Sequence, residues 1–400
     1  MTSKPINIAF CENGAGYGGA IISLEAFLEK IPAPFTPFIY TNIGAAPYPR
    51  LARLGTWRHL APVKTLDPAW LRKRRVPFAS PLENLFNLLP YALRYLAAFK
   101  RDRIDLVYLN NDCTNNLAAT IGARLAGLPL VLHARGFHAD TRATRWVLDQ
   151  VDHCIAVSHA VKDELFALGF APEKCTVVAE GLDLNVFHPR PADGAIRAEL
   201  GLHPEQPIVT LVGGLVDWKG QDVLLDAAPQ IFARFPHAHL LLVGSAYGRD
   251  NRYATEIARR AAAPEFAGRV HMLGARQDIP AILSNSAVVL HASTTPEPFG
   301  RTFLEGMAMG RPTIASKEGG PLDVIEHEVD GLLIAPRDPA LLAASIVRLL
   351  SDAALAARLA HKAADKARHY SIESHADAIS KVLHATLQSN ARSSERNKSR

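Results

Sequence analysis

In the second half of the chain, the residues best suited to chemistry lie in two short stretches, each following a predicted strand. In the first, residues 212–221 (VGGLVDWKGQ), Lys219 comes after two glycines and just before a predicted helix. In the second, residues 291–321, Glu297 precedes a Pro-Phe-Gly turn and Glu305 follows about two helical turns later. Carboxylates accept hydrogen bonds from the paired hydroxyls of a sugar or ribose, and free amides at a helix start favour polar or anionic groups. These residue types therefore indicate a site for a polar, anionic ligand.

Two other interpretations of these stretches remain open. Glu297, Arg301 and Glu305 are spaced i, i+4, i+8, which also fits a ladder of ion pairs on a solvated helix face. Lys219 could be an ordinary surface lysine. However, a cation near a helix N-terminus opposes the helix dipole, and a surface role explains neither this position nor the neighbouring glycines.

A third stretch, rich in glycine, follows the first predicted strand. Gly14, Gly16 and Gly19 satisfy G-x-G-x-x-G between a strand and a helix, a pattern typical of nicotinamide-dependent oxidoreductases. The acidic residue of that fingerprint should follow the second strand, about 20 residues on. Residues 39–42 (IYTN) contain no carboxylate. The loop therefore fits either an anion-binding turn or a tight turn without a ligand.

Short apolar runs alternate with amphipathic helical stretches along the whole chain, which is typical of parallel sheets covered by helices on both faces. The predicted strands are 6–10, 35–40, 104–109, 128–133 and 153–158, followed by 207–213, 238–244, 269–273, 286–292, 312–315 and 331–334.

A stretch rich in proline and glycine near 185–195 separates the two series of strands. We predict an α/β fold with two Rossmann-like, doubly wound parallel-sheet domains, residues 1–188 and 189–370. A terminal helix over 371–388 is expected to pack back on the first domain, and a basic tail over 389–400 to be disordered. Ligands of such sheets bind at the carboxyl ends of the strands, so we expect the site in a cleft between the two domains.

The composition excludes several classes of protein. Hydrophobic residues make up 48% and charged residues 21%, which fits a sizeable core and not wholesale disorder. The four cysteines form no CxxC pair, which argues against a disulfide framework or a cysteine-built zinc site. The sequence also lacks a signal-like start, a bilayer-spanning apolar run, a G-x-S-x-G elbow and an HExxH pair. We expect a cytoplasmic chain without a bound metal.

Three motifs, GGLVDWKGQ, EPFGRTFLEGMA and GGP, resemble the retaining glycosyltransferases of the GT-B fold, specifically glycosyltransferase family four, also called glycosyl transferases group 1. The spacing from Glu297 to Glu305 is that family's E-x7-E element. The N-terminal Gly-Gly loop, the strand end at 157–158 and EGLDLNVF at 180–187 are also similar to family positions. The resemblance covers roughly residues 6–370 and is stronger in the second domain, as expected if the donor domain is shared and the acceptor domain varies.

The resemblance implies a role for each matching residue. Glu305 would bind the ribose hydroxyls of a nucleotide sugar, Glu297 would face the transferred sugar, and Lys219 would hold the diphosphate. The other donor-binding residues that it implies are the Gly18–Gly19 loop at the diphosphate, Phe299 and Gly300 at the sugar, Gly274 and Arg276 near the base, and Arg301.

The chain departs from the family at two positions. The family usually has an arginine where this chain has Gly214, so Arg135 or Arg301 would substitute, or phosphate binding would be weaker. The family often has a histidine after the strand 128–133; here Arg135 holds that position, with His133 on the same strand face. We name His133 and Arg135, with Lys219 and Glu297, as candidate catalytic residues, although either of the first two could be an ordinary strand-end residue.

We therefore predict a retaining, metal-independent glycosyltransferase without a cofactor. It would move a sugar from a UDP- or GDP-sugar to a hydroxyl of a glycan or lipid-linked acceptor. The absence of a DxD sequence agrees with a diphosphate held without metal. The alternatives are a nicotinamide-dependent oxidoreductase using the Gly14–Gly19 loop, and a catalytically silent sugar-nucleotide-binding subunit, indicated only by the missing arginine at Gly214.

Basic residues are concentrated in one part of the first domain. Between Arg50 and Arg103, 12 basic residues stand against three acidic ones. Residues 70–101 combine a basic run with an amphipathic, leucine-rich stretch, which suits contact with an anionic membrane surface on the inner face of the membrane. A core-facing helix preceded by a solvated basic loop is the alternative. We expect no nucleic-acid partner.

Overall fold

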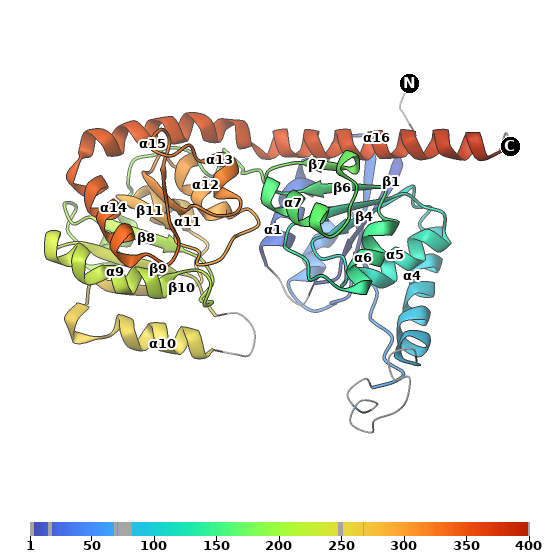
Figure 1. Cartoon of the computed structure of the whole chain (residues 1–400), viewed down its shortest axis with the longest axis horizontal. Coiled ribbons are helices and arrows are strands. Elements are labelled where there is room, and N and C mark those ends of the chain that lie inside the picture. Colours follow the sequence, from blue (N-terminus) through green and yellow to red (C-terminus); the bar gives the residue numbers. More distant parts are fainter. Residues whose placement is uncertain are drawn as a thin grey trace. The chain divides into compact units, whose positions relative to one another are not determined.

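The computed structural model describes residues 4–14, 18–67, 70, 82–246, 251–266 and 268–398. The chain divides into two compact units (Figure 1). Unit 1 consists of Met1–Gly181 and Ile372–Arg400, and unit 2 consists of Leu182–Ser371. Unit 2 begins earlier than the boundary expected after residue 188, because the N–H of Leu182 bonds to the carbonyl of Tyr370 and Leu182 forms a β-bridge with Ser371.

The described part of unit 1 contains a seven-stranded parallel sheet in the order β3-β2-β1-β4-β5-β6-β7. Its strands are β1 Ile6–Glu12, β2 Phe35–Thr41, β3 Thr56–His59, β4 Leu106–Asn110, β5 Leu130–Ala134, β6 His153–Ala156 and β7 Cys175–Val177. The order of the strands reverses between β1 and β4, which is where open parallel sheets bind ligands. The short strands β3 and β7 were not predicted, because strands of three or four residues carry little periodicity.

Helices cover both faces of this sheet. They are α1 Gly19–Glu29, α4 Leu89–Arg101, α5 Leu117–Leu125, α6 Arg142–Gln150, α7 His159–Ala167 and α16 Ile372–Lys398, with short helical turns η1 Tyr48–Arg53, η2 Asn84–Leu88 (π-helical) and η3 Pro172–Lys174. The inner face of α16 lies in the same hydrophobic core as β1, through Ala376, Ile379 and Leu383.

The structure corrects one prediction about the C-terminal segment. Helix α16 continues to Lys398, whereas the sequence predicted a disordered tail from residue 389. Residues 389–398 contain no glycine or proline, so neither of the strong helix breakers ends the helix after its last core contacts.

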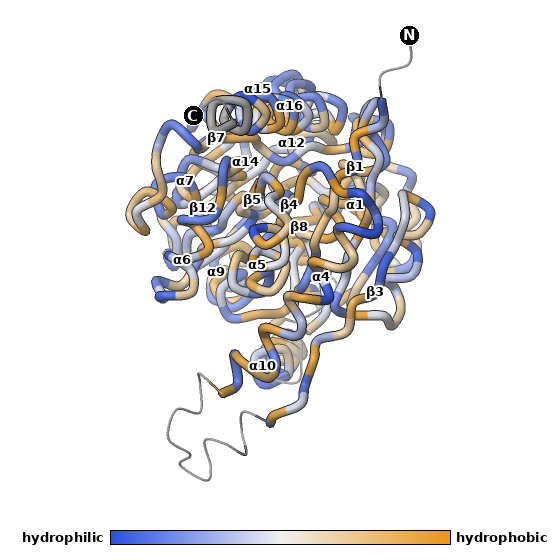
Figure 2. Tube along the Cα trace, turned by 90° about the vertical axis from the view of Figure 1, so that its right-hand side faces the viewer, coloured by the Kyte–Doolittle hydropathy of each residue, from blue (hydrophilic) through white to orange (hydrophobic). Residues whose placement is uncertain are grey.

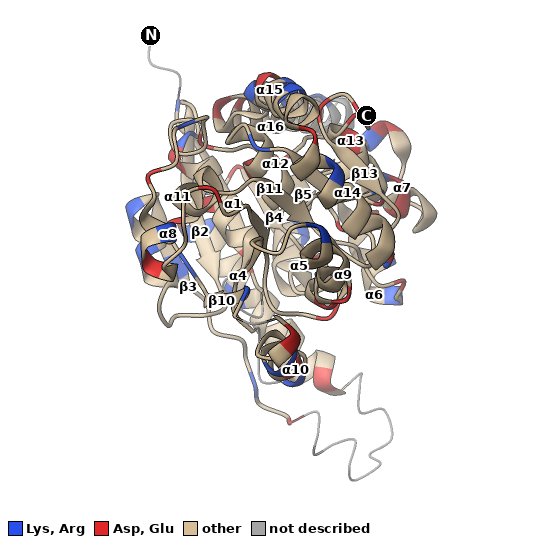
Figure 3. Cartoon of the chain, turned by 90° about the vertical axis from the view of Figure 1, so that its left-hand side faces the viewer, with Lys and Arg blue, Asp and Glu red and all other residues tan. Residues whose placement is uncertain are grey.

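The described part of unit 2 contains a six-stranded parallel sheet in the order β10-β9-β8-β11-β12-β13. Its strands are β8 Ile208–Val212, β9 His239–Val243, β10 Val270–Gly274, β11 Val288–His291, β12 Thr313–Ser316 and β13 Leu332–Ile334. Four of them lie within the predicted runs, and β10 and β12 each extend one residue beyond them. Charged residues lie mainly on the helices and loops, and the strands carry few of them (Figure 3).

The helices of unit 2 are α8 Ala195–Leu200, α9 Gln221–Arg234, α10 Arg252–Ala261, α11 Ile279–Ser284, α12 Arg301–Ala308, α13 Pro321–Val324, α14 Pro339–Ser351 and α15 Ala353–Ala367, with 3₁₀ turns η4 Pro264–Phe266 and η5 Arg368–Tyr370. Among the described residues, no single helix has the length and apolar character needed to cross a bilayer. Two consecutive helical segments, Pro339–Ser351 and Ala353–Tyr370, together have the length and apolar composition of a membrane span. The helix axis is bent by 99° between them.

In unit 2 the strand order reverses between β8 and β11, which lie side by side. The loop after β8 carries Lys219, and the loop after β11 carries Glu297. The two stretches that the sequence singled out thus leave the sheet at the same edge, on neighbouring strands, where ligands of such sheets bind.

Candidate functional site

The β8–α9 and β11–α12 loops bring Lys219 and Glu297 into direct contact. The Nζ of Lys219 pairs with the Oε1 of Glu297, and both side chains are largely buried, at 15% and 10% exposure. The same Nζ lies 4.2 Å from the centroid of the Trp218 ring, a cation–π contact. A buried ammonium and a buried carboxylate therefore meet at the reversal point of the sheet.

The second carboxylate oxygen of Glu297 has two partners that the sequence did not reveal. His291 Nε2 and Ser293 Oγ each lie 2.6 Å from Oε2. His291 ends β11 and Ser293 follows two residues later. Because alternate residues of an extended chain point the same way, this spacing could have identified both side chains as partners of one group. Burial alone raises the pKa of Glu297, but the charge and hydrogen bond of His291, followed by those of Lys219, hold it below its usual range. Glu297 is therefore an acceptor that stays ionised at neutral pH.

Two glycines allow the backbone to pack tightly around this pair. Gly300 has φ +91°, and a Cβ there would lie 2.6 Å from the Nε2 of His291. Gly319 has φ +67°, and a Cβ there would lie 2.1 Å from the carbonyl oxygen of Glu297, which also accepts the N–H of Gly320 at 2.9 Å. The glycines of the GGP motif are thus required sterically, because they let this loop pack against the backbone of Glu297.

The predicted sugar-contacting residues lie at the start of α12. Gly300 caps the helix, and the Phe299 ring packs 5.6 Å from that of Phe303. One turn into the helix, Glu305 is buried, and its Oε1 lies 3.8 Å from the Nε of Arg301. Burial raises the pKa of Glu305, and the charge of Arg301 partly opposes this.

The structure rules out the ion-pair ladder as an explanation of this spacing. Of the three ladder residues, Arg301 pairs with Glu305, whereas Glu297 pairs with Lys219 and His291. Glu297 lies in the loop before α12, and both glutamates are buried, so the three residues do not form a solvated helix face.

The predicted base-contacting residues lie at the same edge of the sheet, two strands away from β8. Gly274 ends β10 with φ +66°, at a β-bulge. The Arg276 guanidinium pairs with Glu199 at 2.9 Å and with Asp278 at 2.7 Å, and these partners raise its pKa. Arg276 is therefore held in place by two carboxylates.

The other predicted site residues belong to unit 1. Gly18 caps α1 with an extended φ of −140°, and Gly19 is the first residue of the helix. A Cβ on either glycine would meet nothing within 4 Å, so the packing of the chain does not demand glycine there. Gly16, the middle glycine of the G-x-G-x-x-G pattern, lies outside the described residues.

The predicted pair at the end of β5 is buried inside unit 1. The Nδ1 of His133 bonds to the hydroxyl of Tyr108, and burial, followed by the charge of Arg135, keeps the pKa of His133 well below its ordinary value. Arg135 donates from Nε to Asn110 at 2.9 Å and pairs through Nη1 with Glu180. Both residues therefore have internal partners, and His133 is a neutral base at pH 7.

A buried carboxylate that the sequence did not single out lies next to this pair. Glu12 ends β1 and accepts a hydrogen bond from the Nδ2 of Asn110, which ends β4. Burial raises the pKa of Glu12 to about 7, although Asn110, Arg135 and the Gly14 amide each oppose the shift. The sequence feature that could have identified Glu12 is that polar residues end both β1 and β4, which are neighbouring strands in the sheet.

We expect Glu12→Gln to change how stability depends on pH. Because the pKa of Glu12 is raised in the folded state, its contribution is fully present below the unfolded value near 4.5 and is lost as pH rises through about 7. The free energy of unfolding of the wild type, relative to the variant, should therefore fall by about 2–3 kcal/mol between pH 5 and pH 8. Urea unfolding at both pH values measures this, and parallel pH profiles would contradict it.

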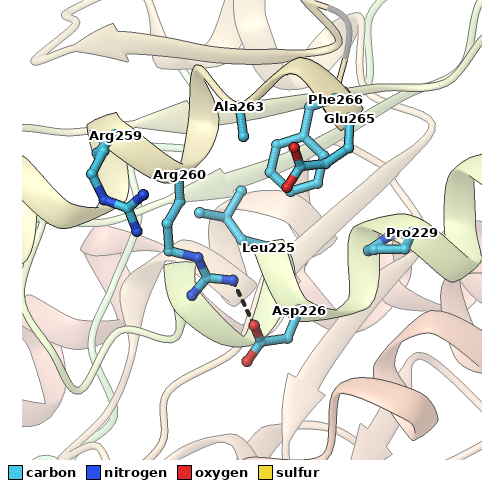
Figure 4. Close-up of a pocket in the computed structure, with 8 residues that line it drawn as sticks. All are labelled: Leu225, Asp226, Pro229, Arg259, Arg260, Ala263, Glu265 and Phe266. Atoms are coloured by element: carbon cyan, nitrogen blue, oxygen red, sulfur yellow. Dashed lines mark hydrogen bonds and ion pairs between the residues drawn. The ribbon is translucent and has the colours of Figure 1, made fainter.

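A cavity of about 330 Å³ lies elsewhere in unit 2, between α9 and the α10–η4 segment (Figure 4). Its lining includes Asp226, Arg259 and Arg260. Arg260 pairs with Asp226 at 2.5 Å, and Arg259 pairs with Glu256 at 2.6 Å. Both arginines are thus paired with carboxylates, and the side chain of Glu265 also lines the cavity.

Comparison with known families agrees with the two-unit division. Residues 193–370 match the family Glycosyl transferases group 1, and residues 49–186 match Glycosyltransferase Family 4. Spore coat protein SA of Bacillus subtilis is 30% identical over 261 residues, covering 60% of this chain and 66% of that protein. The D-inositol 3-phosphate glycosyltransferase of Rhodococcus opacus is 32% identical over 237 residues, covering 58% and 53%. The chain thus spans about half to two thirds of the length of these relatives.

Solved structures share the whole fold. Anabaena HepE, determined in complexes with UDP and with UDP-glucose, superposes with a TM-score of 0.80 at 25% identity over 95% of this chain and 100% of that one. A glycosyltransferase from Rickettsia africae has the same fold, with a TM-score of 0.80 at 18% identity over 96% and 99% of the two chains. With two parallel α/β sheets, the matched families and these neighbours, the chain belongs to the group 1 glycosyltransferases of the GT-B fold.

Proposed function

We propose that the protein transfers a sugar from a UDP- or GDP-sugar to an acceptor hydroxyl, with retention of anomeric configuration and without a metal ion. The observation that carries this proposal is the buried Lys219–Glu297 pair in the β8 and β11 loops, with buried Glu305 on the following helix. All three lie within the stretch matched by the group 1 family. The UDP-glucose complex of HepE supports a nucleotide-sugar donor.

Lys219 performs the main electrostatic task of the proposed reaction. The bond between the anomeric carbon and the diphosphate breaks as a bond to the acceptor oxygen forms, and negative charge develops on the leaving diphosphate. When the donor binds, its phosphates replace Glu297 as the partner of Lys219. A preorganised cation in a buried site stabilises the developing charge without reorganising at the moment of reaction.

The two glutamates hold the donor by its hydroxyls. Glu297, kept ionised chiefly by His291, accepts hydrogen bonds from the transferred sugar. Glu305 accepts bonds from the ribose. The acceptor hydroxyl gives its proton to the departing phosphate, so no side chain of unit 2 has to act as a general base.

We further propose that the acceptor is a glycan or a lipid-linked saccharide and that the enzyme acts at the cytoplasmic face of a membrane. The basic composition of residues 50–103 supports an acceptor held near anionic lipid.

The donor can be identified by thermal unfolding in the presence of UDP-, GDP- and ADP-sugars. Tight donor binding raises apparent stability by mass action, by about 2.7 kcal/mol at a hundredfold excess over Kd. We expect a rise in melting temperature with a UDP- or GDP-sugar that persists in EDTA. NMR of the product should show the anomeric configuration of the donor. An inverted product, or transfer abolished by EDTA, would contradict retention or metal independence, and donor binding without transfer would favour a silent binding subunit.

A further inference from the structure

The helix formed by η2 and α4 in unit 1 has two apolar faces. One face, with Tyr91, Tyr95 and Phe99, is buried in the core of the unit. The other carries Leu85, Phe86, Leu89 and Leu93, which are 54%, 46%, 39% and 48% exposed. Packing against the sheet explains the first face and leaves the second unexplained.

The exposed side chains form a continuous patch. Leu85, Leu89 and Leu93 are spaced i, i+4, i+8 and so follow one face of the helix, with Phe86 beside them. Hydrophobic residues alternate with polar ones along this helix (Figure 2). Isolated exposed leucines are ordinary, but a stripe of this length on one helix marks an interaction surface.

Hydrogen bonds hold a neighbouring segment of chain along the helix. The Asn87 side chain accepts from the backbone of Thr65 at 2.8 Å and donates to the carbonyl of Leu66 at 2.7 Å. The Tyr91 hydroxyl donates to the carbonyl of Leu60 at 2.9 Å. These bonds join residues 60–66 to the helix. The Thr65 hydroxyl also donates to the carbonyl of Phe86, and exposed Lys64 directly precedes Thr65 in the chain.

Exposed cations outnumber carboxylates near the patch, where the carboxylates are those of exposed Asp67, which follows the attached segment, and partly buried Glu83, which precedes η2. Exposed Arg94 and Lys100 lie on the same helix as the leucines, and Lys64 lies on the attached segment. The nearby carboxylate of Asp102 is buried and already paired with Arg58 and Arg101, which hold its pKa below the usual range although burial opposes them. Large apolar side chains bordered by cations are complementary to a partner that has an apolar interior and an anionic surface.

We propose that the η2–α4 patch, comprising Leu85, Phe86, Leu89 and Leu93 with Lys64, Arg94 and Lys100, docks on an anionic lipid bilayer. A bilayer interface accepts the apolar side chains among its acyl chains while its phosphate headgroups meet the cations. The proposal adds the docking surface and the lipid chemistry to the proposed function, on which its biological purpose rests.

Vesicle flotation tests the docking directly. The full chain should float with vesicles of 70% phosphatidylcholine and 30% phosphatidylglycerol and much less with phosphatidylcholine alone, and salt should weaken binding. Leu85→Ser with Leu93→Ser should lower the bound fraction about tenfold, because apolar area that would enter the interface is lost. Lys64→Glu with Lys100→Glu should lower binding to anionic vesicles. Leu341→Ser, at a leucine 39% exposed on α14 of unit 2, is the matched control and should float like the wild type.

Three results would overturn the proposal. The first is wild-type protein that does not float with anionic vesicles, and the second is patch variants that float equally well. The third is a wild-type dimer in solution that Leu85→Ser with Leu93→Ser converts to monomer, because a second copy of the chain would then cover the patch. The melting-temperature rise with donor, measured on the same variants, separates this proposal from the proposed function. Loss of flotation with an intact donor response supports docking, whereas flotation without any donor response contradicts only the sugar-transfer function.

Discussion

Replacing Lys219 by alanine is expected to lower kcat by about 100- to 1,000-fold, the usual cost of losing one preorganised donor that stabilises developing charge. The structure explains why no neighbour substitutes easily. Lys219 is buried beside Trp218 and points at Glu297, and the position where the family usually has an arginine is Gly214. Steady-state kinetics with the donor identified by thermal unfolding measures the effect.

Two further variants separate catalysis from stability. Removing one partner of a buried ion pair costs stability, but Glu297 keeps His291 and Ser293, so the Lys219→Ala protein should still fold. Lys219→Arg retains the charge and should recover part of the turnover. Lys362→Ala, at an exposed lysine on α15, should behave as wild type. Near-wild-type turnover by Lys219→Ala would show that another group holds the diphosphate.

Glu305→Gln is expected to weaken donor binding about 10- to 100-fold while changing kcat at saturating donor only slightly. A carboxylate that accepts from ribose hydroxyls contributes binding in the ground state and the transition state alike, and a hydrogen bond to a charged group accounts for a loss of this size. Titration calorimetry with the donor and a comparison of KM with kcat measure the two quantities.

The stability of the same variant provides an independent check. Because burial raises the pKa of Glu305, its ionisation at neutral pH opposes folding, and Glu305→Gln should be at least as stable as the wild type at pH 8. Glu326→Gln, at an exposed glutamate, is the control for donor affinity. A variant that unfolds, or one that loses kcat and not affinity, would show that Glu305 does not act as a ribose ligand.

The sequence predicted the secondary structure of unit 2 well because most of its strands are buried, although the edge strand β10 is partly exposed. Runs such as residues 240–243 (LLLV) are apolar throughout, and the loops that follow carry the glycines and charged residues typical of a ligand-binding edge. The neighbouring positions of Lys219 and Glu297 followed from strand order, because both loops leave the sheet where that order reverses.

The partners of these residues could not be predicted in the same way. That Glu297 would share its carboxylate between Lys219 and His291 depends on side-chain directions across two loops, which spacing along the chain does not encode. In unit 1, Arg135 was expected on the acceptor side, and its burial against Glu180 depends on a contact between residues 45 positions apart. The roles of Arg135 and of His133 in the reaction stay predictions.

Helix α16 gives unit 1 an unusual order of assembly. The core around Ile8 and Phe10 also contains Ile379 and Leu383, so this unit is built from residues on both sides of unit 2 in the chain. During synthesis, unit 2 can therefore leave the ribosome whole while the first sheet still lacks a helix that shields its apolar surface. Until residues 372–383 emerge, the apolar surface that α16 covers in the folded unit is expected to stay exposed, which favours aggregation of the nascent chain.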